Sequence, residues 1–169
     1  MADALSSLTA VLRTANQTLL TVMDDLTIEQ ANWLPPGTAN TIAQTYAHIV
    51  TSQDHYLNRF ILAQDTIWTR EGWADRLGLP EVLRMSRDAA AEMQLDPAAY
   101  RAYAEQVFAA TEEYVATLTD AELTREVEGY RGPIAVVDVI GRLMTFHATT
   151  HLGEIAAIKG IQGLKGLLF

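Results

Sequence analysis

Apolar residues recur at steps of three and four positions along four long segments of the chain. The segments run from about Asp3 to Asp25, from Asn40 or Thr41 to Ile61, from Asp96 to Leu118 and from Ala135 to Lys159. This spacing places the apolar side chains on one face of an α-helix and the polar residues on the other. Amphipathic helices of this length bury their apolar faces by packing together. The pattern therefore predicts an all-α fold, a four-helix bundle.

The ends of these helices are marked by residues that favour helix termini. Asn40 or Thr41 can cap the second helix, and Asp96 followed by Pro97 is a favourable start for the third. Gly160 ends the fourth helix. A short helical turn is expected at Leu26 to Ala31, before Pro35 and Pro36 interrupt the helical pattern. A further turn should begin at Thr119.

The connection between the second and third helices is long, from Ala63 to Leu95, and its pattern is weak. Only Glu81 to Met93 suggests another short helix. Long connections often cover a site in compact helical domains. Trp68 and Trp73 could therefore form one wall of a pocket, or they could pad the outside of the bundle.

Two other segments depart from the helical pattern. Residues Glu126 to Pro133 are expected to be extended or looped around Gly129 and Gly132. The tail from Ile161 to Phe169 is apolar with repeated glycines. It could fold back on the bundle or cover a partner subunit.

Composition narrows the class of protein. The chain has 169 residues, of which 49% are hydrophobic, so we expect residues 1–169 to form one domain. The net charge of -9 opposes nucleic-acid binding, which needs clustered lysine and arginine. With no cysteine, a metal site must use nitrogen and oxygen ligands. No membrane span or signal peptide is evident, so we expect a cytoplasmic protein.

Candidate chemistry centres on His147 and His151 in the fourth helix. Residues four apart on an α-helix project from one face, so both imidazoles can reach a single cation. This spacing is a recurrent way to supply two nitrogen ligands to a divalent metal, although such pairs are also found as hydrogen-bonded core or surface histidines. Glu154 lies on the same face of the helix. It could be a ligand, a residue that supports a ligand, or a carboxylate that only contacts solvent. A third ligand must come from elsewhere in the bundle.

The second helix carries the two remaining histidines, His48 and His55, at a spacing close to two helical turns. They share a face, near Gln44, and the spacing alone does not choose between them as the third ligand. Each can also be a satisfied core histidine. No second catalytic group stands out, since Glu154, Gln44 and His55 are all weak candidates for a base.

Several motifs together resemble the DinB/YfiT-like superfamily of metal-binding four-helix bundles. They are Leu26-Thr27, Trp33-Leu34-Pro35-Pro36-Gly37, the segment from Thr41 to Ile49 that contains His48, and the segment from Thr145 to Ile155 that contains HxxxH-x-G-E-I. The resemblance spans nearly the whole chain. It implies a metal site with His48 as the first ligand and His147 and His151 as the second and third.

The same resemblance assigns the neighbouring residues. His55 falls where the family more often has an aromatic or variable residue, so it is interpreted as pocket lining. The position of Glu154 is often glutamine in the family, which argues against an obligatory ligand role. The resemblance implies no DNA binding, in agreement with the acidic charge balance. Homodimers are common among relatives.

Three neutral imidazoles with open coordination positions are typical of a catalytic metal site rather than a closed structural one. Zinc or nickel suits these ligands. The ion could activate water for hydrolysis, or bind a low-molecular-weight thiol for transfer or isomerisation. Family members similar to this chain include thiol-dependent S-transferases and a maleylpyruvate isomerase, alongside proteins assigned only as metal-dependent hydrolases, and we favour the thiol-linked chemistry.

The alternative is a non-catalytic metal- or small-ligand-binding bundle in a stress response. On the enzymatic interpretation the partner is a small-molecule substrate, with a low-molecular-weight thiol as a possible cosubstrate. Arg59, Arg142 and Lys159 could meet an anionic substrate.

Overall fold

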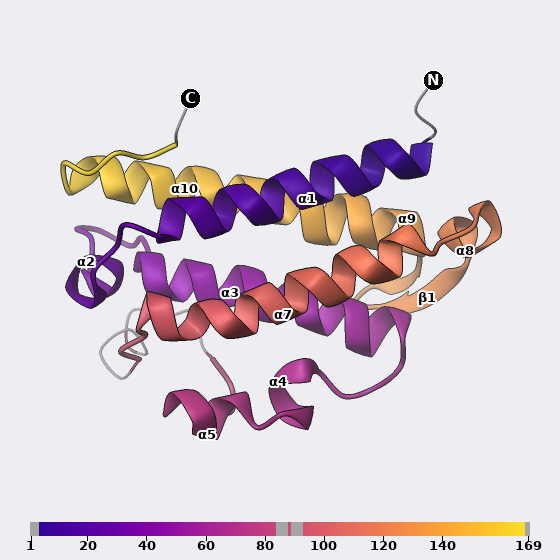
Figure 1. Ribbon diagram of the computed structural model, residues 1–169, viewed down its shortest axis with the longest axis horizontal. Coiled ribbons are helices and arrows are strands. Elements are labelled where there is room, and N and C mark those ends of the chain that lie inside the picture. The colour runs from indigo at the N-terminus through magenta and orange to yellow at the C-terminus, as the bar shows by residue number, and fades with distance from the viewer. Residues whose placement is uncertain (1–3, 84–87, 89–92, 168–169) are drawn as a thin grey trace.

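The computed structural model describes residues 4–83, 88 and 93–167, and four long helical segments dominate it (Figure 1). These are α1 (Ala4–Met23), α3 (Ile42–His55) continued by the π-helix η1 (Tyr56–Ile61), α7 (Pro97–Ala116), and α9 (Val136–Asp138) continued by the π-helix η2 (Val139–Phe146) and α10 (His147–Ile161). Helix α1 contacts α7 and α10, and α3 contacts the same two helices from the other side. The predicted all-α four-helix bundle is therefore confirmed.

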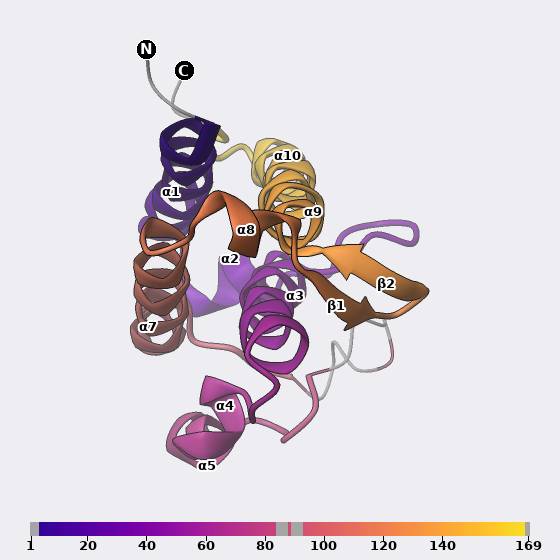
Figure 2. The ribbon, with the colours of Figure 1, turned by 90° about the vertical axis from the view of Figure 1, so that its right-hand side faces the viewer.

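Shorter elements fill the connections. They are α2 (Ile28–Asn32), α4 (Ile67–Arg70), α5 (Trp73–Leu77), α8 (Asp120–Thr124), β1 (Glu126–Gly129) and β2 (Gly132–Ala135). The strands form an antiparallel hairpin that projects beside the bundle (Figure 2). The long connection between the second and third helices contains α4 and α5, while the helix predicted from Glu81 to Met93 falls largely outside the described residues.

Side-chain caps fix the starts of two long helices. The hydroxyl of Thr41 accepts a hydrogen bond from the Gln44 amide, and the Gln44 side-chain oxygen accepts one from the Thr41 amide in return. Asp96 accepts hydrogen bonds from the amides of Ala98 and Ala99. Both starts match the predicted positions, because capping depends on residues that are close in sequence.

The two tryptophans of the long connection, which lie in α4 and α5, are buried inside the molecule. Trp68 and Trp73 are 5% and 4% exposed. Each ring packs against Tyr103 of α7, with ring centroids 5.1 and 5.6 Å away. Neither tryptophan pads the outside of the bundle. Together they attach the long connection to α7.

The described part of the C-terminal tail folds back on α10. A Cβ atom added to Gly166 would lie 3.0 Å from the Ala156 carbonyl oxygen, so the absence of a side chain permits this close approach. Leu167 packs against the main hydrophobic core. The tail thus covers part of its own bundle.

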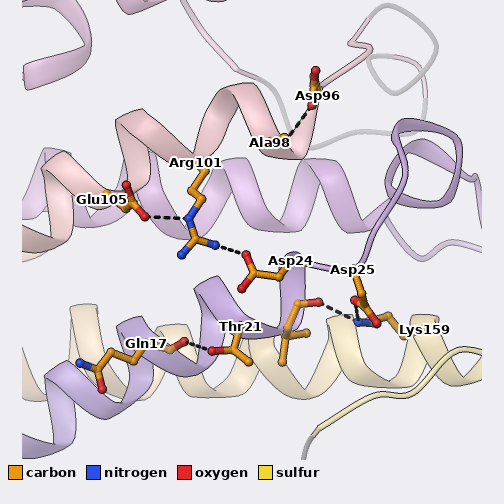
Figure 3. Close-up of polar contacts among 10 residues, drawn as sticks. Gln17, Thr21, Asp24, Asp25, Asp96, Ala98, Arg101, Glu105 and Lys159 are labelled. Carbon is orange, nitrogen blue, oxygen red and sulfur yellow. Dashed lines mark hydrogen bonds and ion pairs between the residues drawn. The ribbon is translucent and has the colours of Figure 1, made fainter.

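Lys159, a candidate contact for an anionic substrate, has a structural position instead. Its buried ammonium group donates hydrogen bonds to the Val22 carbonyl oxygen at 2.7 Å and to Asp25 at 2.5 Å (Figure 3). These partners lie at the C-terminal end of α1, where a cation is favoured by the helix dipole. Lys159 is therefore occupied in joining α10 to α1.

Candidate metal centre

Three histidines converge between α3 and α10. His48 comes from α3, whereas His147 and His151 lie one turn apart at the start of α10. One nitrogen from each ring can be chosen so that all lie within 4.8 Å of one another. The Nε2 atoms of His48 and His147 are 2.9 Å apart. The structure therefore brings together the three histidines that the resemblance singles out.

This cluster fits a divalent ion. Zinc binds imidazole nitrogen at about 2.0–2.1 Å in a tetrahedral arrangement, so two of its ligand nitrogens lie roughly 3.3 Å apart. The three nitrogens of the cluster lie within 4.8 Å of one another, and those of His48 and His147 are 2.9 Å apart, so a bound ion would need only small movements of these side chains. The three residues are half-buried, which leaves room for further ligands from solvent or substrate.

The π-helix η2 directly precedes His147 and sets its position in the cluster. The amide of His147 donates to the Arg142 carbonyl at the end of η2, and the Thr145 hydroxyl donates to the Ile140 carbonyl five residues earlier. A π-turn contains more residues than an α-turn, so η2 changes which residues of the fourth helix face α3. Apolar periodicity in the sequence did not reveal this change, nor the similar one in η1.

The surroundings favour neutral imidazoles. Burial, and next the nearby His151, lowers the pKa of His48. Burial, together with His48 and His151, lowers the pKa of His147 to about 4. Metal binding requires the unprotonated ring, so protons compete weakly with a metal at these residues near neutral pH.

The lowered pKa of His147 predicts a pH-dependent stability for the metal-free protein. Below the usual value of 6.5 the unfolded chain takes up a proton at this position that the folded chain resists until about pH 4. The free energy of unfolding should therefore decrease as the pH falls from 6.5 towards 4. Urea unfolding at several pH values measures this, and the decrease should be smaller in His147→Asn. An identical pH dependence in the variant would contradict the conclusion that His147 causes this loss of stability.

Glu154 supports His151. Its Oε2 atom lies 2.6 Å from the His151 Nδ1 atom. A carboxylate beside Nδ1 accepts a hydrogen bond from the Nδ1–H group and leaves Nε2 free to bind a metal, as in many carboxylate–histidine–metal arrangements. The geometry thus favours a supporting role for Glu154 over a direct ligand role.

Replacing Glu154 by alanine should weaken metal binding by about 10-fold, the low end of the range for supporting residues, because this carboxylate is half exposed. A competition titration with a chromogenic zinc chelator measures the change. Glu113, an exposed residue of α7, provides a control with the same loss of charge. Equal zinc affinities in the Glu154 and Glu113 variants would show that Glu154 does not support the metal site.

A cavity of about 530 Å³ adjoins the cluster on the side of His48. His55, Arg59, Trp68 and Tyr130 are among its lining residues. The His55 ring is stacked on Tyr130, with an interplanar angle of 7° and centroids 5.7 Å apart. His55 and Trp68 therefore both line this cavity.

Gln44 lies elsewhere. It is 1% exposed and is not among the cavity's lining residues. Its side-chain oxygen accepts the Thr41 amide hydrogen bond, which defines the start of α3. Gln44 is therefore part of the capping box that begins α3.

Sequence reasoning missed Asp54, which is among the lining residues of the cavity. This 1% exposed residue accepts hydrogen bonds from the Ile67 and Trp68 amides, the Asn58 side chain and the Tyr103 hydroxyl. The sequence offers one signal, a carboxyl group among apolar helix positions. Asp54 joins α4 and α7 to α3 through these hydrogen bonds.

Fold and site together define a helical bundle with a three-histidine group consistent with metal binding. The DinB superfamily matches residues 12–155, and the chain belongs to this superfamily. No curated protein matches the chain.

The fold also matches a solved structure, the conserved protein of a locus from Enterococcus faecalis. The TM-score is 0.75 at 15% sequence identity, over 95% of this chain and 99% of that one. At this identity the similarity extends to the fold alone. None of the described helices combines the length and hydropathy needed to cross a membrane.

Proposed function

We propose that this protein is a metal-dependent enzyme in which His48, His147 and His151 hold one zinc or nickel ion. The observation that supports the proposal most strongly is the convergence of their three ring nitrogens within 4.8 Å beside a cavity large enough for a small molecule. Three protein ligands leave at least one coordination position for a reactant.

The reaction that fits best is transfer or isomerisation linked to a low-molecular-weight thiol. A divalent ion held by the three histidines would lower the pKa of a coordinated thiol, so that the thiol would release its proton to solvent near neutral pH. Hydrolysis would gain more from a separate carboxylate base. The carboxyl groups close to the site are engaged by protein groups, since Glu154 contacts His151, Asp54 accepts four hydrogen bonds and Glu81 accepts one from Thr69.

The cavity's residues provide the surroundings for such a substrate. His55, Tyr130 and Trp68 present ring surfaces, and Arg59, paired with Asp65 at 2.7 Å, lies at the same wall. Aromatic rings beside a bound thiol would reduce its contact with water. We also propose that the functional form is a homodimer, as the resemblance implies.

The test compares two variants of α3. The zinc- or nickel-loaded protein is assayed with glutathione and 1-chloro-2,4-dinitrobenzene, alongside His48→Ala and His55→Ala. We expect His48→Ala to lose both metal and thiol transfer, and His55→Ala to retain the metal. Metal binding without turnover, across a panel of thiols and electrophiles, would favour the non-catalytic alternative.

A further inference from the structure

A second hollow lies beside the cavity, between the β1–β2 hairpin and η2. Its volume is about 360 Å³. The lining residues are Gly129, Tyr130, Arg131, Gly132, Pro133, Ile134, Arg142 and Leu143. Arg131 comes from the turn of the hairpin and Arg142 from the middle of η2, so the fold places two arginines from different elements at one hollow.

This hollow is positively charged in an acidic protein. No acidic residue is among its lining residues, whereas the chain as a whole carries a net charge of -9. Arg131 and Arg142 form no ion pair within residues 4–83, 88 and 93–167. Asp138, four residues before Arg142, is not paired with it in that part of the chain.

Most other cations that the structure describes are neutralised. Those with a carboxylate partner are Arg13, Arg59, Arg76, Arg101, Arg125 and Lys159. Arg70 donates to Asn58 and to the Asp65 carbonyl oxygen instead. Besides the two arginines of the hollow, Lys165 in the tail is the remaining unpaired cation among the described residues. Two of these three cations therefore face one hollow.

The hollow is contiguous with the histidine site. Tyr130 lines both the hollow and the larger cavity. The Arg142 carbonyl accepts the hydrogen bond of the His147 amide, so Arg142 lies one π-helical turn before a proposed metal ligand. A molecule in the larger cavity can thus extend past Tyr130 towards both arginines.

We infer that this hollow binds the anionic group, a carboxylate, of the molecule whose reactive end lies at the histidine cluster. Guanidinium groups bind carboxylates through paired charge-assisted hydrogen bonds, and two of them at one concave surface favour a ligand with one or two carboxylates. The inference rests on the proposed function and adds the charge class of the ligand. It assigns Arg131 and Arg142 as specificity residues.

The first test does not need a metal. Succinate is titrated into ¹⁵N-labelled protein, and the amide resonances of residues 129–132 and 134 are followed, with uncharged succinamide as the matched ligand. We expect succinate to shift these resonances, and its affinity to fall about 10- to 100-fold in the double variant Arg131→Gln/Arg142→Gln. A second double variant, Arg13→Gln/Lys165→Gln, has the same net charge and should bind succinate like the wild type.

The second test links the hollow to the metal. Nickel-loaded protein is titrated with glutathione and with glutathione diethyl ester, which has the same thiol but no free carboxylate, and the thiolate-to-nickel absorption is recorded. We expect the wild type to prefer glutathione, and Arg131→Gln/Arg142→Gln to bind both thiols equally.

The outcomes separate the two proposals. Absence of nickel binding, or of a thiolate band with either thiol, contradicts the proposed function, while the succinate titration still reports on the hollow. Normal nickel and thiol binding with no preference for the acid, or a preference that the double variant keeps, overturns the inference and leaves the metal site intact. Succinate affinities that are equal in the two double variants also overturn it.

Discussion

The His147→Ala variant is expected to bind zinc more than about 100-fold more weakly than the wild type. Loss of a group that only supports a ligand weakens metal binding by about 10- to 100-fold, so loss of a ligand itself should exceed that range. The Nε2 atom of His147 lies 2.9 Å from that of His48. Its removal leaves two nitrogens, too few to hold one ion firmly.

Chelator competition gives the affinity, and far-ultraviolet circular dichroism verifies that the variant remains helical. His55→Ala is the matched control, because it removes a cavity-lining imidazole outside the cluster. Wild-type affinity in His147→Ala would exclude His147 as a ligand. Loss of helicity on removing the metal from the wild type would show that the ion chiefly stabilises the fold.

The second large effect is expected on stability. Asp54→Ala should lower the free energy of unfolding by at least about 3 kcal/mol, because it leaves several buried donors without an acceptor. The two backbone donors, Ile67 and Trp68, begin α4, and the Tyr103 hydroxyl belongs to α7. The variant should therefore lose the attachment of the long connection as well as global stability. Urea unfolding of metal-free protein measures the change.

Asp65→Ala provides the control for this variant. Asp65 is exposed and pairs with Arg59 at the surface, so its loss should alter stability by less than about 1 kcal/mol. Equal stability changes in the two variants would show that the hydrogen bonds of Asp54 contribute little. Restored stability in Asp54→Asn would instead show that acceptor oxygen matters more than charge.

Local signals predicted the helices well. The capping residues Thr41 and Asp96 act on amides only two or three positions away, so sequence spacing contains the necessary information. The pair His147 and His151 shares one helical turn and was predicted on the same grounds. Such predictions need no knowledge of how the helices pack.

Tertiary packing decided the features that periodicity left open. His48 and His55 share a face of the second helix, and only the position of α10 brings His48 to the cluster and leaves His55 at the cavity wall. The resemblance to the superfamily had anticipated this choice. The side chain of Gln44 takes part in the capping box of α3, a local contact that the sequence spacing from Thr41 contains.

Other features had no clear sequence signal. The π-helices η1 and η2 change the helical phase without interrupting the apolar pattern. Arg131 was not singled out, because its approach to Arg142 depends on the hairpin's packing beside η2. The role of Asp54 likewise depends on amides 13 and 14 residues away.

X-ray absorption spectroscopy of the zinc-loaded protein tests the proposed metal site most directly. The expected spectrum shows three imidazole nitrogens at about 2.0–2.1 Å and one light-atom ligand. Adding glutathione should replace the light atom by sulfur at about 2.3 Å. Fewer than three imidazoles, or no ordered zinc at one ion per chain, would contradict a metal centre formed by His48, His147 and His151.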